Sequence, residues 1–147
     1  MKGVNLFGHF SSTNYQQTFS TEHITEDLIQ KTTKQFIGKI QQFPPVFSAL
    51  KKDGKRLYEF ARAGEHVDIP SRTVTISEFE ITKINGLTID FRVVCSKGTY
   101  IRSLANDFGK ALNSGAHLSV LRRTKIGAFD VAIATSIEDF IKNLSSE

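Results

Sequence analysis

The stretch CSKGTYIR at residues 95–102 decides the fold, because it joins a strand to a helix. The strand is indicated by apolar residues at every second position, namely Leu87, Ile89, Phe91, Val93 and Cys95. Apolar residues at helical spacing in residues 103–112 predict the helix that follows. A lysine, a tyrosine and an arginine therefore lie where the backbone changes direction, a position from which side chains can reach a ligand. The alternative is a basic connection with a solvated lysine, and the spacing alone leaves both interpretations open.

The segments that precede this stretch are predicted to be mainly helical. Thr25 can cap a helix over residues 26–37, with acidic residues in its first turn and lysines further along, as the helix dipole favours. The two prolines at 44–45 force an extended turn, and the apolar residues in 46–50 indicate a short buried segment. A second helix is predicted over residues 55–63, because its apolar residues recur at helical spacing.

Two further strands are predicted beside the central one. Residues 73–82 are rich in β-branched side chains, and the shift of apolar parity between Ile76 and Phe79 predicts a bulge. The Asn-Gly pair at 85–86 predicts a hairpin turn into the central strand. Residues 122–131 are predicted to form another strand, which begins with basic residues.

The two ends of the chain carry weaker patterns. Residues 1–20 show no clear period and indicate a weak strand or a loop. A capping box at residues 135–138, beginning with Thr135, predicts a short final helix. Strands interleaved with helices, without an internal repeat, predict an α+β domain with a mixed, mainly antiparallel sheet and flanking helices.

Length and composition favour one domain with a hydrophobic core. The chain has 147 residues, among them twelve phenylalanines, so one core can be built and two would be small. The single cysteine cannot form an internal disulfide, which favours a cytoplasmic location. No secretory signal and no apolar run long enough to cross a membrane is apparent, so no membrane partner is expected.

Basic residues are clustered, although the net charge of +4 is modest. The first cluster contains Lys51, Lys52, Lys55, Arg56 and Arg62, and the second contains Arg122, Arg123 and Lys125. Lys97 and Arg102 flank Tyr100, so cations that hold phosphates and a ring that stacks on a base come together. This pattern favours RNA as a partner. The alternative is a half-buried core tyrosine with solvated arginines around it.

Other chemistry finds little support in the sequence. The four histidines are isolated from one another and one cysteine cannot complete a zinc set, so no metal site is expected. The glycines lack the spacing of a phosphate-binding loop. The aspartates at 53, 68, 90, 107 and 130 show no pattern of paired carboxylates, and Cys95 falls on the apolar face of its strand, where it packs.

Three motifs, in this order and spacing, resemble the bacterial tRNA pseudouridine synthases of the TruB type. The first comprises PPVFSALKK at residues 44–52 with GKRLYEFARAG at 54–64. The second is CSKGTYIRSL at 95–104, and the third comprises GAHL at 115–118 with LRRT at 121–124. The resemblance covers roughly residues 20–140.

The resemblance implies an enzyme that isomerises a uridine in the T-loop of transfer RNA to pseudouridine without a cofactor. In this family the base is flipped out, an aspartate is the nucleophile, and the uracil is detached, turned and rejoined through carbon. By resemblance Arg102 pairs with that aspartate and orients it, Tyr100 lines the uracil pocket and Leu121 packs against the flipped base. Lys97 and the two basic clusters are then expected to hold the T-arm of the tRNA.

The sequence departs from the family in one serious respect. The family's catalytic aspartate lies in a Gly-x-Leu-Asp-Pro motif that has no match in this chain, and Asp90 has the wrong place and spacing. We therefore expect residues 1–147 to form a single partial domain, the second part of the catalytic domain, without a C-terminal RNA-binding domain and inactive alone. A sheet cut in this way is expected to self-associate through an exposed edge. A non-catalytic RNA-hairpin-binding module and an inert fragment are the alternatives.

Overall fold

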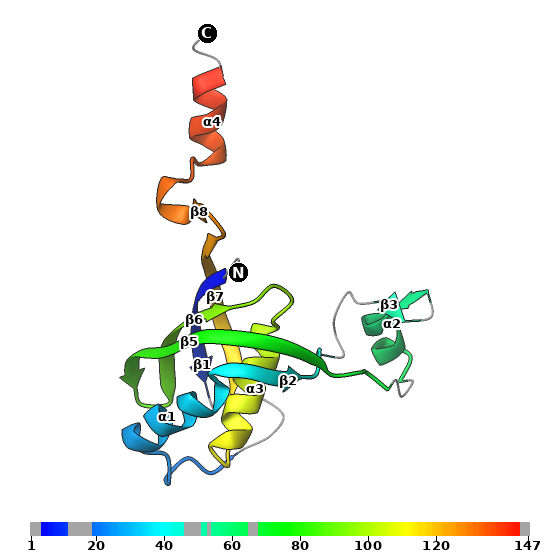
Figure 1. Ribbon diagram of the computed structural model, residues 1–147, viewed down its shortest axis with the longest axis vertical. Coiled ribbons are helices and arrows are strands. Elements are labelled where there is room, and N and C mark those ends of the chain that lie inside the picture. Colours follow the sequence, from blue (N-terminus) through cyan, green and yellow to red (C-terminus); the bar gives the residue numbers. More distant parts are fainter. Residues whose placement is uncertain (1–3, 12–18, 46–50, 53, 65–67, 145–147) are drawn as a thin grey trace.

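A six-stranded antiparallel sheet forms the body of the computed structural model, which describes residues 4–11, 19–45, 51–52, 54–64 and 68–144 (Figure 1). Its strands lie in the order β2-β5-β6-β1-β7-β8. Their bounds are Gly38–Gln42 for β2, Arg72–Asn85 for β5, Thr88–Cys95 for β6, Val4–Ser11 for β1, His117–Ile126 for β7 and Phe129–Asp130 for β8. All neighbouring strands of this sheet pair antiparallel, so the predicted α+β class with a mainly antiparallel sheet is confirmed.

Helices α1 (Glu26–Thr33) and α3 (Ile101–Ala111) pack on one face of the sheet, with the short η1 (Lys34–Phe36) next to α1. Figure 1 shows α2 (Leu57–Arg62) beside the small ribbon of β3 (Lys51–Lys52) and β4 (Lys55–Arg56), at a distance from the sheet. The turn η2 (Val131–Ile133) and helix α4 (Ile137–Leu144) extend beyond the end of β7. The helices thus leave most of β7 uncovered.

The β5–β6 hairpin follows the predicted pattern closely. Burial alternates along the whole of β6, so its apolar residues face the helices. The pairing with β5 shifts register between Ile76 and Glu78, which confirms the predicted bulge. The turn itself is one residue later than predicted, because Asn85 pairs with Thr88 and Gly86 takes the left-handed conformation with φ +58°. Leu87 therefore lies in the turn and is exposed, so its placement on the strand's buried face was wrong.

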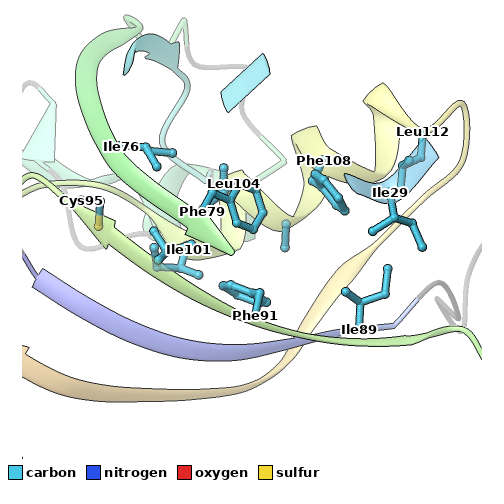
Figure 2. Packing of buried hydrophobic residues seen from close by; sticks show 12 residues of the cluster. Ile29, Ile76, Phe79, Ile89, Phe91, Cys95, Ile101, Leu104, Phe108 and Leu112 are labelled. Carbon is cyan, nitrogen blue, oxygen red and sulfur yellow. The ribbon is translucent and has the colours of Figure 1, made fainter. Parts of the chain in front are cut away.

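Phenylalanine rings fill the space between the sheet and the helices (Figure 2). The rings of Phe79 and Phe108 lie 5.3 Å apart, and Phe79 also meets Phe91 at 5.7 Å. Phe36 of η1 contacts Phe108 at 5.8 Å. Aromatic pairs at these distances add to the stability that burial provides, so α3 is held firmly on β5 and β6.

The first predicted helix forms as α1 followed directly by η1, so that only its last turn differs from the α-helix expected over residues 26–37. Thr25 caps α1 as predicted, with its Oγ1 accepting a hydrogen bond from the backbone of Leu28 at 3.2 Å. The α-helical part ends at Thr33 and the chain continues as the 3₁₀ turn η1 to Phe36. The hydroxyls of Thr32 and Thr33 bind back to carbonyls of the preceding turn, at 2.7 and 2.8 Å. Such bonds compete with the helix and favour its end.

Two other element bounds also differ from the sequence interpretation. The strand predicted from residue 122 begins at His117, because β1 pairs along its full length with β7. The last helix is capped by Ser136 and not by Thr135, since Ser136 Oγ accepts from the Asp139 amide at 3.1 Å. The predicted buried segment at 46–50 lies outside the described residues.

Candidate functional site

The connection between β6 and α3 is held by hydrogen bonds on both sides. Ser96 donates its amide to the carbonyl of Thr75 at 2.8 Å and accepts at Oγ from the Thr75 amide at 3.0 Å. Thr99 then donates its hydroxyl to the Ser96 carbonyl at 2.9 Å. Gly98 has φ +82°, a conformation that a residue with a side chain rarely adopts. The predicted site residues of this connection therefore rise from a fixed backbone.

Tyr100 is half-buried and is held by β2 and β5. The side-chain amide of Gln42 accepts from the Tyr100 amide at 2.7 Å and donates to its carbonyl at 3.1 Å. The guanidinium carbon of Arg72 lies 5.7 Å from the centre of the tyrosine ring, within range of a cation–π interaction. Sequence reasoning missed both Gln42 and Arg72. Their pairing across β2 and β5, which brings them together, has no local signal in the sequence.

Arg102 is exposed on the first turn of α3 and lines a cavity of about 340 Å³. The cavity is bounded on one side by residues of α3 and on the other by the segment that follows β2. Its lining consists of Phe43, Pro44, Pro45, Arg102, Ser103, Asn106, Asp107 and Lys110. The cavity thus combines cations, an apolar wall and one carboxylate, that of Asp107.

Leu121 lies on β7, on the face of the sheet that carries the helices. Through β1, Leu121 is in register with Phe91 and Arg123 is in register with Val93, and the side chains of both β6 residues are buried against the helices. Leu121 is nevertheless 47% exposed, because the helices leave β7 uncovered. Phe91, with which Leu121 is in register, lies four residues before Cys95 at the end of β6. Leu121 is therefore about 13 Å from the level of Cys95, measured along the strand direction.

The second basic cluster is divided between two faces of the sheet. Arg122 and Lys125 are in register with Arg92 and Val94, whose side chains lie on the face opposite the helices. Arg123 lies on the helix-bearing face with Leu121. Strand alternation and the register shift between Asn5 and Leu6 cause this division. One RNA strand on a single face would therefore not meet all three cations.

The remaining predicted RNA contacts lie at two places. Lys97 is exposed in the turn after β6. Lys51 and Lys52 form β3, and Lys55 and Arg56 form β4, which pairs with it. The side chains of these four residues lie outside the described part of the structure.

Cys95 is buried beneath the connection, with 2% of its surface exposed. Burial raises the pKa of its thiol above the usual range, while a hydrogen bond with Thr99 and the charge of Arg123 act in the opposite direction. A protonated, buried thiol is a poor nucleophile, as the sequence interpretation held. Within the described ranges, no three His, Cys, Asp or Glu side chains are grouped as metal ligands. None of the helices in these ranges is long and apolar enough to cross a membrane.

Residues 8–101 match the family model described as "TruB family pseudouridylate synthase (N terminal domain)". The chain belongs to the TruB family. The family resemblance drawn from the three motifs is thereby confirmed. A second model, described as "tRNA pseudouridylate synthase B C-terminal domain", matches residues 102–146. The boundary between the two matches falls in the first turn of α3, where Ile101 and Leu104 are buried in one core. That residues 1–147 form a single partial catalytic domain without a C-terminal RNA-binding domain stays a prediction.

Curated TruB relatives match most of this chain. A tRNA pseudouridine synthase B of Flavobacterium johnsoniae is 67% identical over 132 residues, which cover 90% of this chain and 58% of the relative. A relative of the same name from Phocaeicola vulgatus is 53% identical and is covered to 52% of its length. The chain therefore spans about half the length of the curated relatives that it matches.

Solved structures of more distant proteins share the fold. The crystal structure of a Cbf5-Nop10-Gar1 complex matches 95% of this chain with a TM-score of 0.71 and 30% identity, and 35% of the matched chain is covered. A structure of an H/ACA RNP bound to a substrate RNA containing 2'-deoxyuridine matches with a TM-score of 0.67 and 27% identity. The fold of this chain thus recurs in a protein of a complex whose structure contains a bound substrate RNA.

Proposed function

We propose that this chain supplies the arginine and tyrosine part of a TruB-type active site, which isomerises a uridine in the T-loop of tRNA to pseudouridine. The reaction takes place in the cytoplasm and needs no cofactor. The nucleophilic aspartate comes from an upstream segment, so the chain alone does not catalyse. The observation that carries the proposal is the CSKGTYIR connection, which holds Tyr100 by a fixed backbone and leaves Arg102 accessible beside a cavity.

The chemistry assigns a separate role to each side chain. The guanidinium of Arg102 holds the incoming aspartate ionised and orients it for attack on the flipped nucleotide. Tyr100 lines the pocket for the uracil, and the cation of Arg72 lies on its ring. Leu121 offers an exposed apolar contact on β7 for the detached base. Lys97 and the cations of the sheet bind phosphates of the T-arm.

The exposed apolar surface at the end of the chain supports the need for a further segment. Nine large apolar side chains from β7 onward are exposed by 45% or more, and these are Val120, Leu121, Ile126, Phe129, Ile133, Ile137, Phe140, Ile141 and Leu144. Leu121 and Ile126 share the helix-bearing face of β7, whereas Val120 lies on the opposite face. An exposed apolar surface that includes Leu121, Ile126 and α4 favours an interaction site. We expect the upstream segment to cover it, and the isolated chain to self-associate through it. A monodisperse monomer in light scattering would count against this expectation.

The test is the release of tritium from a T-stem-loop with 5-tritiated uridine. The chain is assayed alone and after addition of the separately made upstream half of the Flavobacterium johnsoniae relative. We expect release only in the mixture, and a loss of about 100-fold in the Arg102→Ala variant, because an interaction with developing charge is removed. Lys31→Ala is the matched control, since this exposed lysine of α1 pairs only with Asp27 of its own helix in the described ion pairs.

Asp107 is the carboxylate that could replace the missing aspartate, because it lines the same cavity as Arg102. Its carboxylate accepts a hydrogen bond from the side-chain amide of Asn106 at 3.3 Å. Release by the chain alone, abolished in Asp107→Asn, would make Asp107 the nucleophile and refute the need for a second segment. Release in the mixture that survives Asp107→Asn is the expected result.

The second candidate is a non-catalytic module that binds an RNA hairpin. The exposed Lys97, Arg122, Arg123 and Lys125 favour it, because cations on both faces of one strand can contact a backbone that wraps around the sheet edge. Tighter binding of a T-arm hairpin than of an unrelated hairpin, with a marked salt dependence and no release in the mixture, would support this candidate over the enzyme.

A further inference from the structure

The end of β2 is joined to the start of α3 by a buried side-chain amide. Gln42 is the last residue of β2, and its side chain is completely buried. Its Oε1 accepts from the amide of Tyr100 at 2.7 Å, and its Nε2 donates to the carbonyl of the same residue at 3.1 Å. One amide thereby satisfies both backbone groups of Tyr100, as a neighbouring strand would do. The peptide planes on both sides of Tyr100 are fixed.

A third hydrogen bond joins α3 to Phe43, the residue that follows β2. Ser103 is buried and donates its hydroxyl to the carbonyl of Phe43 at 2.7 Å. Arg102 lies directly before Ser103 and lines the cavity whose opposite wall begins at Phe43. We refer to Gln42 and Ser103, with these three hydrogen bonds, as the Gln42–Ser103 clamp.

The clamp also determines what surrounds the tyrosine ring. Gln42 pairs in register with Arg72 of β5, and the guanidinium of Arg72 lies over the ring of Tyr100. The strand pair therefore holds Tyr100 twice, by its backbone through Gln42 and by its ring through Arg72. Tyr100 is the N-cap of α3 and makes no side-chain cap of its own, so the direction in which the helix starts depends on these contacts.

We infer that Gln42 and Ser103 are positioning residues, which set the direction of Tyr100 and Arg102 for the isomerisation. The inference rests on the proposed function. A buried apolar side chain could fill the volume of Gln42, but it could not bind both backbone groups of Tyr100. Without the clamp the start of α3 can rotate, and a displacement of about 1 Å of a catalytic group can reduce turnover about 100-fold.

The sequence offers a matched pair of variants, Gln42→Met and Gln41→Met. Gln41 is the neighbouring residue of β2, is exposed, and donates its amide to Thr73 Oγ1 at 2.9 Å without a described contact to α3. Methionine keeps the volume of glutamine and removes the hydrogen bonds. Ser103→Ala is the second variant of the clamp, because it removes one hydroxyl and leaves the helix intact.

Two measurements test separately whether the clamp holds the backbone of Tyr100 and whether the reaction depends on it. Hydrogen exchange of the Tyr100 amide in this chain is expected to accelerate about tenfold in Gln42→Met and to stay unchanged in Gln41→Met. In tritium release by the mixture, kcat is expected to fall about 100-fold in Gln42→Met, with KM for the hairpin within about threefold of wild type. Ser103→Ala is expected to lower kcat in the same way, to a smaller extent.

Wild-type kcat in Gln42→Met, or an equal loss in Gln41→Met, would overturn the inference and leave the proposed function standing. Unchanged exchange at Tyr100 would show that the clamp does not hold the backbone. A wild-type mixture that releases no tritium would refute the proposed function and with it the use inferred for the clamp. The exchange comparison would then still report separately on the hydrogen bonds.

Discussion

Gly109 in the last turn of α3 provides a sharp test of how the helix packs against the start of β7. A glycine inside a helix normally costs about 1 kcal/mol relative to alanine, so Gly109→Ala should stabilise an isolated helix. In the folded chain, an added Cβ would meet the backbone nitrogen of Ala116, and would lie 2.6 Å from Gly115 C and 2.8 Å from Ala116 Cβ. Backbone atoms cannot turn away as a flexible side chain does. We therefore expect an overpacking cost near the upper end of the usual range of about 1–3 kcal/mol.

The two effects leave a net destabilisation of about 1–2 kcal/mol for Gly109→Ala, measured by urea unfolding with far-UV circular dichroism. Asn106→Ala is the control, because Asn106 is exposed on the same helix. Its gain in helix propensity is opposed only by the loss of one long, exposed hydrogen bond to Asp107, so a stabilisation of up to about 0.5 kcal/mol is expected. If Gly109→Ala unfolds at the same or a higher urea concentration than wild type, the close approach of α3 to the start of β7 is wrong.

Three further predictions concern the core, the thiol and the last helix. Phe108→Ala is expected to cost about 3–5 kcal/mol in urea unfolding, because the ring is completely buried among Phe36 and Phe79, whereas Phe140→Ala, on an exposed face, should cost less than about 0.5 kcal/mol. Burial raises the pKa of the Cys95 thiol, so its contribution to the free energy of unfolding is full below the ordinary thiol value of 9.0 and is lost as pH rises through the folded pKa. Urea unfolding over a pH series measures this, and a free energy of unfolding that falls as steeply with pH in Cys95→Ala as in wild type would contradict it. Ser136→Ala removes the cap of α4 and should lower the helicity of α4, seen in NMR chemical shifts, without moving the urea midpoint of the sheet.

The part of the fold that local patterns determine was predictable from the sequence. Alternation along β6, the parity shift between Ile76 and Phe79 and the cap at Thr25 each depend on neighbouring residues, and the structure confirms all three. The strand β1 was only weakly indicated, because its position between β6 and β7 depends on partners far along the chain. The early start of β7 at His117 was missed for the same reason.

The candidate site shows the same limit. Tyr100 and Arg102 were found because they stand in a recognisable motif at a strand-to-helix junction. Gln42 was missed, although its side chain is buried and holds Tyr100, because the two residues are 58 positions apart in sequence. A buried polar side chain finds its partners only once the sheet has formed. The division of Arg122 and Arg123 between two faces follows from alternation along the predicted strand, whereas the side on which Lys125 lies depends on the register shift against β1.

The last helix, α4, exposes one apolar stripe. Ile137, Phe140, Ile141 and Leu144 recur at the spacing of an amphipathic stripe, yet they are exposed by 76, 57, 56 and 63%. A helix of eight residues is too short to be stable without packing, so a surface must cover this stripe in the active protein. On β7, Leu121 and Ile126 are also exposed and lie on the helix-bearing face, where the base is proposed to bind. We propose that the upstream segment that brings the aspartate to Arg102 also covers α4.

This reasoning predicts the effect of charges placed on the stripe. The double variant Phe140→Asp with Ile141→Asp should raise the concentration of upstream segment needed for half-maximal tritium release by at least about tenfold, since two buried apolar contacts are each worth more than 1 kcal/mol. The urea midpoint of the chain alone should not change, because the core cluster of the described residues contains no part of α4. Glu138→Gln with Lys142→Gln is the control, since both are charged residues of the same helix outside the stripe. Normal complementation by the double aspartate variant would show that α4 is not the surface that receives the segment, and the aspartate would have to reach Arg102 by another route.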